Sequence, residues 1–353
     1  MTGLSIEEGI KQVFGGGHVV ILGAGASIAS TIRNREKNGL ILPSMNNFIE
    51  VVGLEDIVRD IPEHLHADNF ETLYGNLHRE EPDSPYLREI ENRIQNYFRG
   101  MELPDEPTIY DYLVLALREK DLIATFNWDP FLYQAFNRNR PCTNNQPHLS
   151  FLHGNVAIGY SPEDKRCGPV GMFVRQDGGY LAPTKLLYPV EEKNYTDDEF
   201  ISIEWERVRF WMSKSSRTVR ATIFGYGAPD SDVEAVTLLN NAWGTPEERE
   251  MEQFEIIDIT PEEQLRDRWS GFILSHHYNV ASNYFESSLA LNPRRTSESY
   301  YSHYQPLTPS EAFRQNNPIP QNFKTLQELW DWHKPLIDAE LEWEEKQKNK
   351  NEG

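Results

Sequence analysis

Three polar side chains that can do chemistry each follow a short apolar run: Asn127, Asp129 and His153. An amide can hold a ribose hydroxyl or a water molecule without adding charge, and a carboxylate can orient a ribose. A histidine is the natural general base near neutral pH. Each residue also has an ordinary structural interpretation: a turn residue for Asn127, a helix cap for Asp129 and a hydrogen-bonded core side chain for His153. Considered one at a time, Asp129 and His153 favour the structural interpretation.

A glycine-rich turn, Gly23-Ala-Gly25, directly follows the apolar run 18–22. Glycines at such a turn let the backbone approach a pyrophosphate, and the start of the next helix supplies positive potential. The full dinucleotide fingerprint has a third glycine, but Ile28 stands at its position. The same residues therefore also fit a plain strand-to-helix turn.

Five short apolar runs predict the strands that must position these residues, and four of the five end in Gly, Asn or His. The runs are 18–22, 121–126, 149–152, 218–224 and 254–259. Because they alternate with helical segments, we expect an α/β fold: a Rossmann-like parallel sheet with helices on both faces. Ligands of such sheets bind where the carboxyl ends of the strands open, which is where the polar residues fall.

The segments between the predicted strands differ in character. Residues 54–117 read mostly helical and predict a smaller inserted lobe, within which Thr108 caps a helix. Residues 155–200 are rich in Gly, Pro and charge and predict loops with short hairpins. Near the end, Thr325 begins a capping box and a terminal helix that we expect to break or kink at Pro335.

Several kinds of site are excluded by motif. The chain has no GxxxxGK[ST] phosphate loop, no HExxH helix and no GxSxG elbow. Its two cysteines, Cys142 and Cys167, are too few for a cysteine zinc site. We therefore expect no metal site.

Charge and hydropathy bound the class of protein. The formal net charge of −21 disfavours non-specific nucleic-acid binding by this chain, because an acidic surface repels phosphate. The first residues do not resemble a signal peptide, and no apolar run approaches the roughly 20 residues of a membrane span. We expect a cytoplasmic protein with no membrane contact.

Taken in order, four segments resemble the sirtuin (silent information regulator) superfamily: 23–27, 125–129, 151–154 and 224–227, with Asp258 on the last predicted strand. The family pattern is a GAGxS loop, a T-x-N-x-D segment, a catalytic histidine before glycine, and a glycine-containing turn under the adenosine half. The resemblance spans residues from roughly 15 to 260 and implies a domain that binds NAD⁺.

The resemblance also implies a role for each matching residue. Asn127 would sit beside the nicotinamide ribose and position the attacking group, and Asp129 would shape that pocket. His153 would act as a base on a ribose hydroxyl or on water. The residues implied in NAD⁺ binding are Gly23, Ala24, Gly25 and Ser27 for the pyrophosphate, Gly225, Tyr226 and Gly227 for the adenosine half, Asp258 for the adenine ribose, and in addition Thr125 and Phe126.

Two departures from the family matter. The four-cysteine zinc module of protein-deacylating sirtuins is missing, and Leu42-Pro-Ser-Met45 stands in place of the GIPDFR-type segment. Both departures resemble bacterial sirtuin-like domains of antiphage defence, which hydrolyse NAD⁺ to ADP-ribose and nicotinamide. In that branch helices, here those of 54–117, replace the zinc module as the smaller lobe.

The resemblance implies an NAD-binding catalytic domain over 1–260 and a C-terminal extension over 261–353 for oligomer or partner contact. Because an unregulated NAD⁺ hydrolase harms its cell, we expect control by homo-oligomerisation or by a separate partner such as a HerA-type ATPase. Two alternatives stay open. One is a non-catalytic module that senses NAD⁺ or ADP-ribose; whether Asn127 and His153 face one pocket separates it from the hydrolase. The other is a protein deacylase or ADP-ribosyltransferase, against which the missing zinc module argues.

Overall fold

The structure is a computed structural model of the 353-residue chain. It describes residues 16–32, 39–174, 179–190, 195–213, 218–227, 232–245, 253–270, 278–300 and 317–351.

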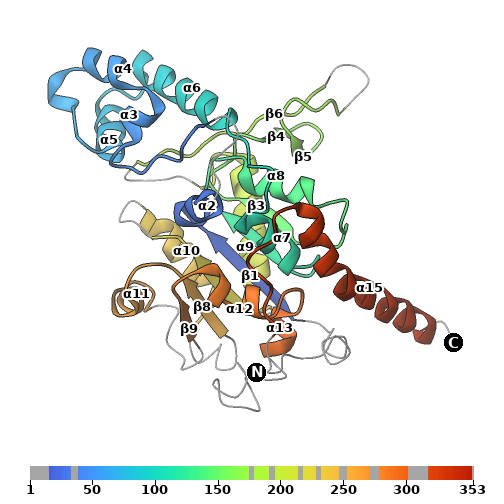
Figure 1. Cartoon of the computed structure of the whole chain (residues 1–353). Coiled ribbons are helices and arrows are strands. Elements are labelled where there is room, and N and C mark those ends of the chain that lie inside the picture. The colour runs from blue at the N-terminus through green and yellow to red at the C-terminus, as the bar shows by residue number, and fades with distance from the viewer. Residues whose placement is uncertain are drawn as a thin grey trace.

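Within these residues, six strands form a parallel sheet in the order β3-β2-β1-β7-β8-β9 (Figure 1). The strands are β1 (Gly17–Leu22), β2 (Leu122–Thr125), β3 (His148–Phe151), β7 (Thr218–Phe224), β8 (Gln253–Ile257) and β9 (Tyr278–Ala281). All five predicted strands are present, and the predicted α/β fold with a Rossmann-like parallel sheet is confirmed. The chain winds outward from β1 in one direction, then returns to β7 and winds the other way. This reversal between β1 and β7 is the point where doubly wound sheets open a crevice at their carboxyl ends.

Alternate residues of β1 face two separate cores, as the pleat of a strand requires. Val20 and Leu22 pack in one core, whereas Val19 and Ile21 pack in the other. The first core takes residues of α2 (Ala24–Thr31), α7 (Ile109–Ala116), α8 (Phe131–Arg138) and α12 (Ser288–Leu291). The second takes residues of α9 (Glu199–Met212), α10 (Val233–Trp243) and α11 (Glu262–Arg268). Helices therefore cover both faces of the sheet, as predicted.

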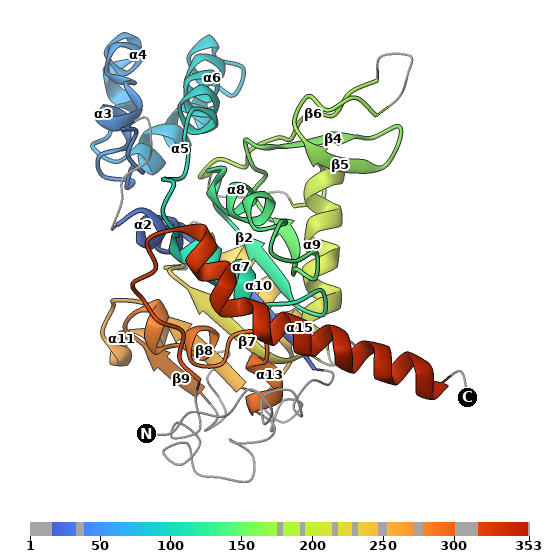
Figure 2. The ribbon, with the colours of Figure 1, turned by 45° about the vertical axis from the view of Figure 1, so that its right-hand side comes forward.

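A helical lobe stands apart from the sheet in Figures 1 and 2. It consists of α3 (Phe48–Val52), α4 (Glu55–Asp60), the 3₁₀ turn η1 (Glu63–Leu65), α5 (Phe70–Glu80) and α6 (Pro85–Arg99). The lobe therefore begins before residue 54 and ends before residue 117. Helix α7, which was expected within the lobe, belongs to the sheet layer because it packs against α2, α8 and α12, and all but its first residue are buried. Thr108 opens α7 with the predicted capping box, closed by Asp111.

A second sheet is small and antiparallel, in the order β5-β4-β6. Its strands are β4 (Ile158–Ser161), β5 (Arg166–Pro169) and β6 (Ala182–Pro183). They fall within 155–200, where the sequence predicts loops and short hairpins.

The sheet continues past residue 260. Strand β9 pairs in parallel with β8, so the expected domain boundary falls between two paired strands. This strand lies in the predicted C-terminal extension, because the segment Tyr278-Asn-Val-Ala281 is too short and too polar to predict a strand. Helix α15 (Leu326–Asn351) starts after Thr325 as predicted and includes Pro335. Of the predicted break or kink at Pro335, the break is absent. Within the described residues, no helix has both the length and the apolar character that crossing a bilayer needs.

Candidate functional site

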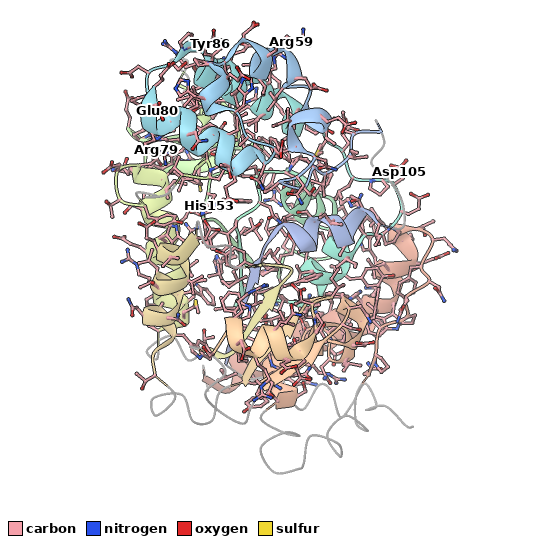
Figure 3. The ribbon with its side chains drawn as sticks, turned by 90° about the vertical axis from the view of Figure 1, so that its left-hand side faces the viewer. Arg59, Arg79, Glu80, Tyr86, Asp105 and His153 are labelled. Carbon is pink, nitrogen blue, oxygen red and sulfur yellow. The ribbon has the colours of Figure 1, made fainter. Side chains whose placement is uncertain are left out.

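A cleft of about 330 Å³ lies at the carboxyl ends of β1, β2, β3 and β7. Figure 3 shows His153 at the level where the helical lobe meets the body of the molecule. The cleft brings together residues that are far apart in the sequence, including both Asn127 and His153. The predicted site residues that line it are Gly23, Ala24, Ser27, Phe126, Asn127, Asp129, His153, Gly225, Tyr226 and Gly227.

Three predicted residues do not line the cleft. Gly25 lies under the first turn, and its N–H donates to the carbonyl of Gly225 at 2.9 Å. Thr125 accepts a hydrogen bond from the backbone N–H of Asn127 at 3.0 Å and so shapes the bend behind the cleft. Asp258 accepts one from the N–H of Thr260 at 2.8 Å. An adenine ribose at Asp258 would have to extend beyond the cleft.

The glycines of the two turns are required by close packing of one backbone on another. A Cβ on Gly23 would lie 2.4 Å from the Cα of Tyr226, and one on Gly225 would lie 2.4 Å from the nitrogen of Ala26. Gly225 also has a φ of +59°, which L residues rarely adopt. The turn after β1 is thus locked against the turn after β7. Helix α2 begins at this turn with no side-chain cap. In its first turn, the N–H groups of Gly25 and Ala26 donate to the carbonyls of Gly225 and Gly23.

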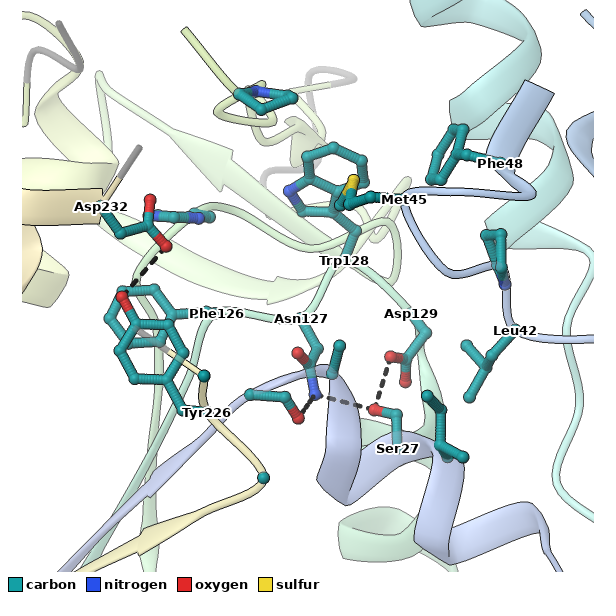
Figure 4. Close-up of a pocket in the computed structure, with 18 of the residues that line it drawn as sticks. Ser27, Leu42, Met45, Phe48, Phe126, Asn127, Trp128, Asp129, Tyr226 and Asp232 are labelled. Atoms are coloured by element: carbon teal, nitrogen blue, oxygen red, sulfur yellow. Dashed lines mark hydrogen bonds between the residues drawn. The ribbon is translucent and has the colours of Figure 1, made fainter. Parts of the chain in front are cut away.

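Asn127 is held firmly at the floor of the cleft. Its Nδ2 donates to the carbonyl of Gly23 at 2.8 Å and to Ser27 Oγ at 2.8 Å (Figure 4). Its Oδ1 accepts no hydrogen bond from the described residues and lies on the opposite side of the amide from Ser27 (Figure 4). Asn127 therefore offers the cleft an acceptor rather than a donor.

Asp129 contacts both the start of α8 and Ser27 on the cleft wall. Its Oδ1 accepts the backbone N–H of Phe131 at 3.1 Å, at the first residue of α8. Its Oδ2 accepts the hydroxyl of Ser27 at 2.7 Å. Asp129 thus holds the chain just before α8, whose N-cap residue is Pro130, and also lines the cleft.

His153 lies between two aromatic rings. Its ring meets Phe126 edge-on at 4.7 Å and stacks on Tyr195 at 5.8 Å. His153 Nε2 lies 3.2 Å from the Tyr195 hydroxyl, within hydrogen-bonding distance. Burial raises the pKa of Tyr195 above its usual range, so this phenol stays neutral near pH 7. The imidazole is thus both oriented and in contact with the cleft.

Several lining residues were not among the predicted site residues. The lobe and the segment before it supply an apolar wall that faces Trp128, whose ring meets those of Phe48 and Phe98 edge-on. The wall residues from this part of the chain are Leu42, Pro43, Met45, Phe48 and Phe98. Hydrophobic periodicity predicts such residues only as core residues. The sequence does not show that the lobe lies beside the cleft at the end of the sheet.

The charged lining residues are acidic: Glu71, Asp129 and Asp232. Tyr226 donates its hydroxyl to Asp232 at 3.0 Å. None of the described lining residues is Lys or Arg. An anionic group bound among these residues would therefore depend on backbone amides. No group of three or more potential metal-ligating side chains occurs within the described ranges.

Comparison with known proteins gives distant structural similarity only. No family model matches the chain, and neither does any curated protein. A Sir2 homolog–NAD complex aligns at 12% identity over 80% of this chain and 91% of that one, with a TM-score of 0.36. A mutant Sir2 homologue with ADP-ribose aligns at 13% identity over 69% and 80%, with a TM-score of 0.35. Another, with 2′-O-acetyl ADP-ribose, aligns at 13% identity over 76% and 86%, with a TM-score of 0.37. At this level of similarity, function has to be inferred from the cleft itself.

Proposed function

We propose that this protein binds NAD⁺ in the cleft and hydrolyses its nicotinamide–ribose bond. One observation carries the proposal: the four segments that resemble the sirtuin pattern meet in this cleft. They contribute a glycine turn at a helix start, an amide oxygen and an imidazole. These are the groups needed to hold a pyrophosphate, position a nucleophile and accept a proton.

The proposed hydrolysis can be written with every bond and proton accounted for by NAD⁺, water and the side chains of the cleft. The bond between ribose C1′ and the pyridinium nitrogen breaks, and its electron pair neutralises the ring as nicotinamide leaves. The oxygen of water bonds to C1′ and gives up a proton, and ADP-ribose is released. In this scheme Asn127 positions the water or a ribose hydroxyl, and His153 accepts the proton. General-base help of this kind contributes typically about 10²–10⁴-fold to the rate.

The remaining roles follow the same scheme. The turn Gly23–Ser27, at the start of α2, holds the pyrophosphate, and Asp129 shapes the ribose pocket. The turn Gly225–Gly227 contacts the adenosine half. We also propose that the protein is a defence effector controlled by self-association or by a partner such as a HerA-type ATPase, because uncontrolled NAD⁺ loss is toxic.

The test is NAD⁺ loss by the purified protein, alone and with candidate partner proteins, beside Asn127→Ala and His153→Ala. We expect release of nicotinamide and ADP-ribose, lowered at least about 100-fold in both variants. His148→Ala is the matched control, because His148 is exposed at the start of the strand that leads to His153 and lies outside the cleft. Its activity should equal that of the wild type.

A second candidate function is a non-catalytic module that senses NAD⁺ or ADP-ribose. The observation that favours it is the contact of His153 with Tyr195, since a hydrogen-bonded buried histidine needs no catalytic role. If the protein bound ADP-ribose but hydrolysed no NAD⁺ under any condition, the result would support the sensing module and contradict the hydrolase.

A further inference from the structure

A buried hydrogen-bond network beneath the cleft includes a tyrosine that the proposed chemistry does not use. Tyr110, on α7, is fully buried. Its hydroxyl lies 2.6 Å from Ser27 Oγ, and Asn127 Nδ2 lies 3.2 Å from the same hydroxyl. The network therefore connects a helix behind the sheet to the amide at the floor of the cleft.

The direction of each hydrogen bond in this network can be assigned. The hydroxyl of Ser27 donates its only hydrogen to Asp129, at 2.7 Å. Ser27 must then accept from Tyr110, which donates. Burial raises the pKa of Tyr110 above its usual range, so its hydroxyl keeps the proton it donates. With Asn127 Nδ2 as a second donor at 2.8 Å, both lone pairs of Ser27 are occupied.

This assignment leaves the amide of Asn127 with one permitted orientation. Its NH₂ group faces three acceptors: the carbonyl of Gly23, Ser27 Oγ and the hydroxyl oxygen of Tyr110. A flipped amide would place Oδ1 against the carbonyl of Gly23, which has no hydrogen, and against Ser27, whose hydrogen is committed to Asp129. The network thus directs Oδ1 away from Ser27, as drawn in Figure 4.

We propose that Tyr110 is a positioning residue for the hydrolysis: it fixes Ser27 and Asn127 so that the amide oxygen of Asn127 stays presented to the cleft. The inference rests on the proposed function for its kinetic consequence. It does not need that function for its structural part, because the hydrogen bonding of the Asn127 amide can be measured directly. Tyr110 acts through Ser27 and Asn127 and is not in the cleft lining.

The experiment compares the full chain with Tyr110→Phe, which keeps the ring and removes the hydroxyl. The side-chain NH₂ signals of Asn127, identified by their loss in Asn127→Ala, report on the amide through their exchange with water. We expect exchange at least about tenfold faster in Tyr110→Phe. Tyr284→Phe is the matched control, since Tyr284 is equally buried but its hydroxyl has no hydrogen-bond partner within the described chain.

The kinetic arm measures kcat and KM for NAD⁺ under the conditions in which the wild type is active. We expect kcat to fall by at least about tenfold in Tyr110→Phe with KM within about twofold, because a small misplacement of a reacting group is costly. The loss should disappear in the background of Asn127→Ala. Unchanged exchange in Tyr110→Phe would overturn the proposal, as would faster exchange with unchanged kcat. An inactive wild type would overturn the proposed function alone, and exchange would still decide whether Tyr110 fixes the amide.

Discussion

At the scale of single residues, the turns under the cleft are constrained by their own packing as much as by any ligand. Gly225 accepts a hydrogen bond from Gly25 while its own Cα lies against the backbone of α2. A tight turn and a nucleotide site therefore require the same glycines. This is why the glycine pattern alone could not distinguish the two interpretations in the sequence.

The packing of Gly225 can be tested by Gly225→Ala. The new Cβ would lie 2.4 Å from the nitrogen of Ala26, at a φ of +59°. We expect the free energy of unfolding to fall by about 3–4 kcal/mol, from left-handed strain plus the clash. Urea unfolding measures it. Gly53→Ala is the matched control: its φ is +76° but nothing lies within 4 Å of the new Cβ, so only the strain of about 1–2 kcal/mol remains. Equal losses in the two variants would refute the clash.

Sequence reasoning located the cleft residues that follow strands, because a strand end is visible as the end of an apolar run. Asn127 and His153 were found in this way. Tyr110 and Tyr195 were not, because a tyrosine in an apolar helix or in a polar loop carries no local sign of its partner. Their roles depend on contacts with Ser27 and His153, which lie 83 and 42 residues away in the sequence.

At the scale of elements, α9 holds the end of β3 and with it His153. Glu204 accepts the N–H of Phe151 at 2.8 Å, and Trp205 Nε1 donates to the carbonyl of Leu152 at 3.2 Å. Both contacts fall on the two residues just before His153. Helix α9 thus fixes the position of the end of β3, and with it the position of the His153 imidazole beside the cleft.

Glu204→Ala tests this support. The change leaves the buried N–H of Phe151 without its acceptor and deprives Arg207 of its partner at 2.7 Å. We expect a loss of about 1–3 kcal/mol in the free energy of unfolding and slower NAD⁺ turnover. Urea unfolding and nicotinamide release measure the two. Glu206→Ala is the control, because Glu206 is exposed on the same helix. If both variants behaved alike, α9 would have no part in positioning His153.

Elements were predictable where the hydrophobic pattern was strong. The strands β1, β2 and β7 are buried along their whole length, so apolar residues form most of β1 and β2 and alternate with Thr and Arg in β7. Strand β9 is an edge strand with three half-buried residues, and its pattern is weak. Helix α7 carries a strong helical signal, but only tertiary packing decides that it covers the sheet rather than the lobe.

At the scale of the whole molecule, the acidic surface and the buried histidines respond to acid in opposite directions. The net charge of −21 means that protonation of exposed carboxylates relieves self-repulsion. His18 and His333, by contrast, are fully buried, and burial holds the pKa of each below its ordinary value of 6.5. Total stability against pH therefore mixes both effects, and a variant is needed to separate them.

His333→Gln isolates one buried histidine. Burial lowers the pKa of His333 to about 3, so the folded protein keeps it neutral while the unfolded chain protonates it below 6.5. The unfolded state then binds more protons, and the wild type should lose stability as the pH falls from 6.5 toward 3, by up to about 1.4 kcal/mol per pH unit for this residue. Above pH 6.5 His333 is neutral in both states and adds no pH dependence to the free energy of unfolding.

In the variant, Gln can still donate to the carbonyl of Leu329, which His333 Nδ1 contacts at 2.9 Å, but it does not titrate. Urea unfolding of both proteins at pH 7.5 and at lower pH should give a stability difference that shifts in favour of the variant only below 6.5. His64→Gln, at an exposed histidine, is the matched control. A difference independent of pH would mean that His333 accepts its proton in the folded state as readily as in the unfolded chain.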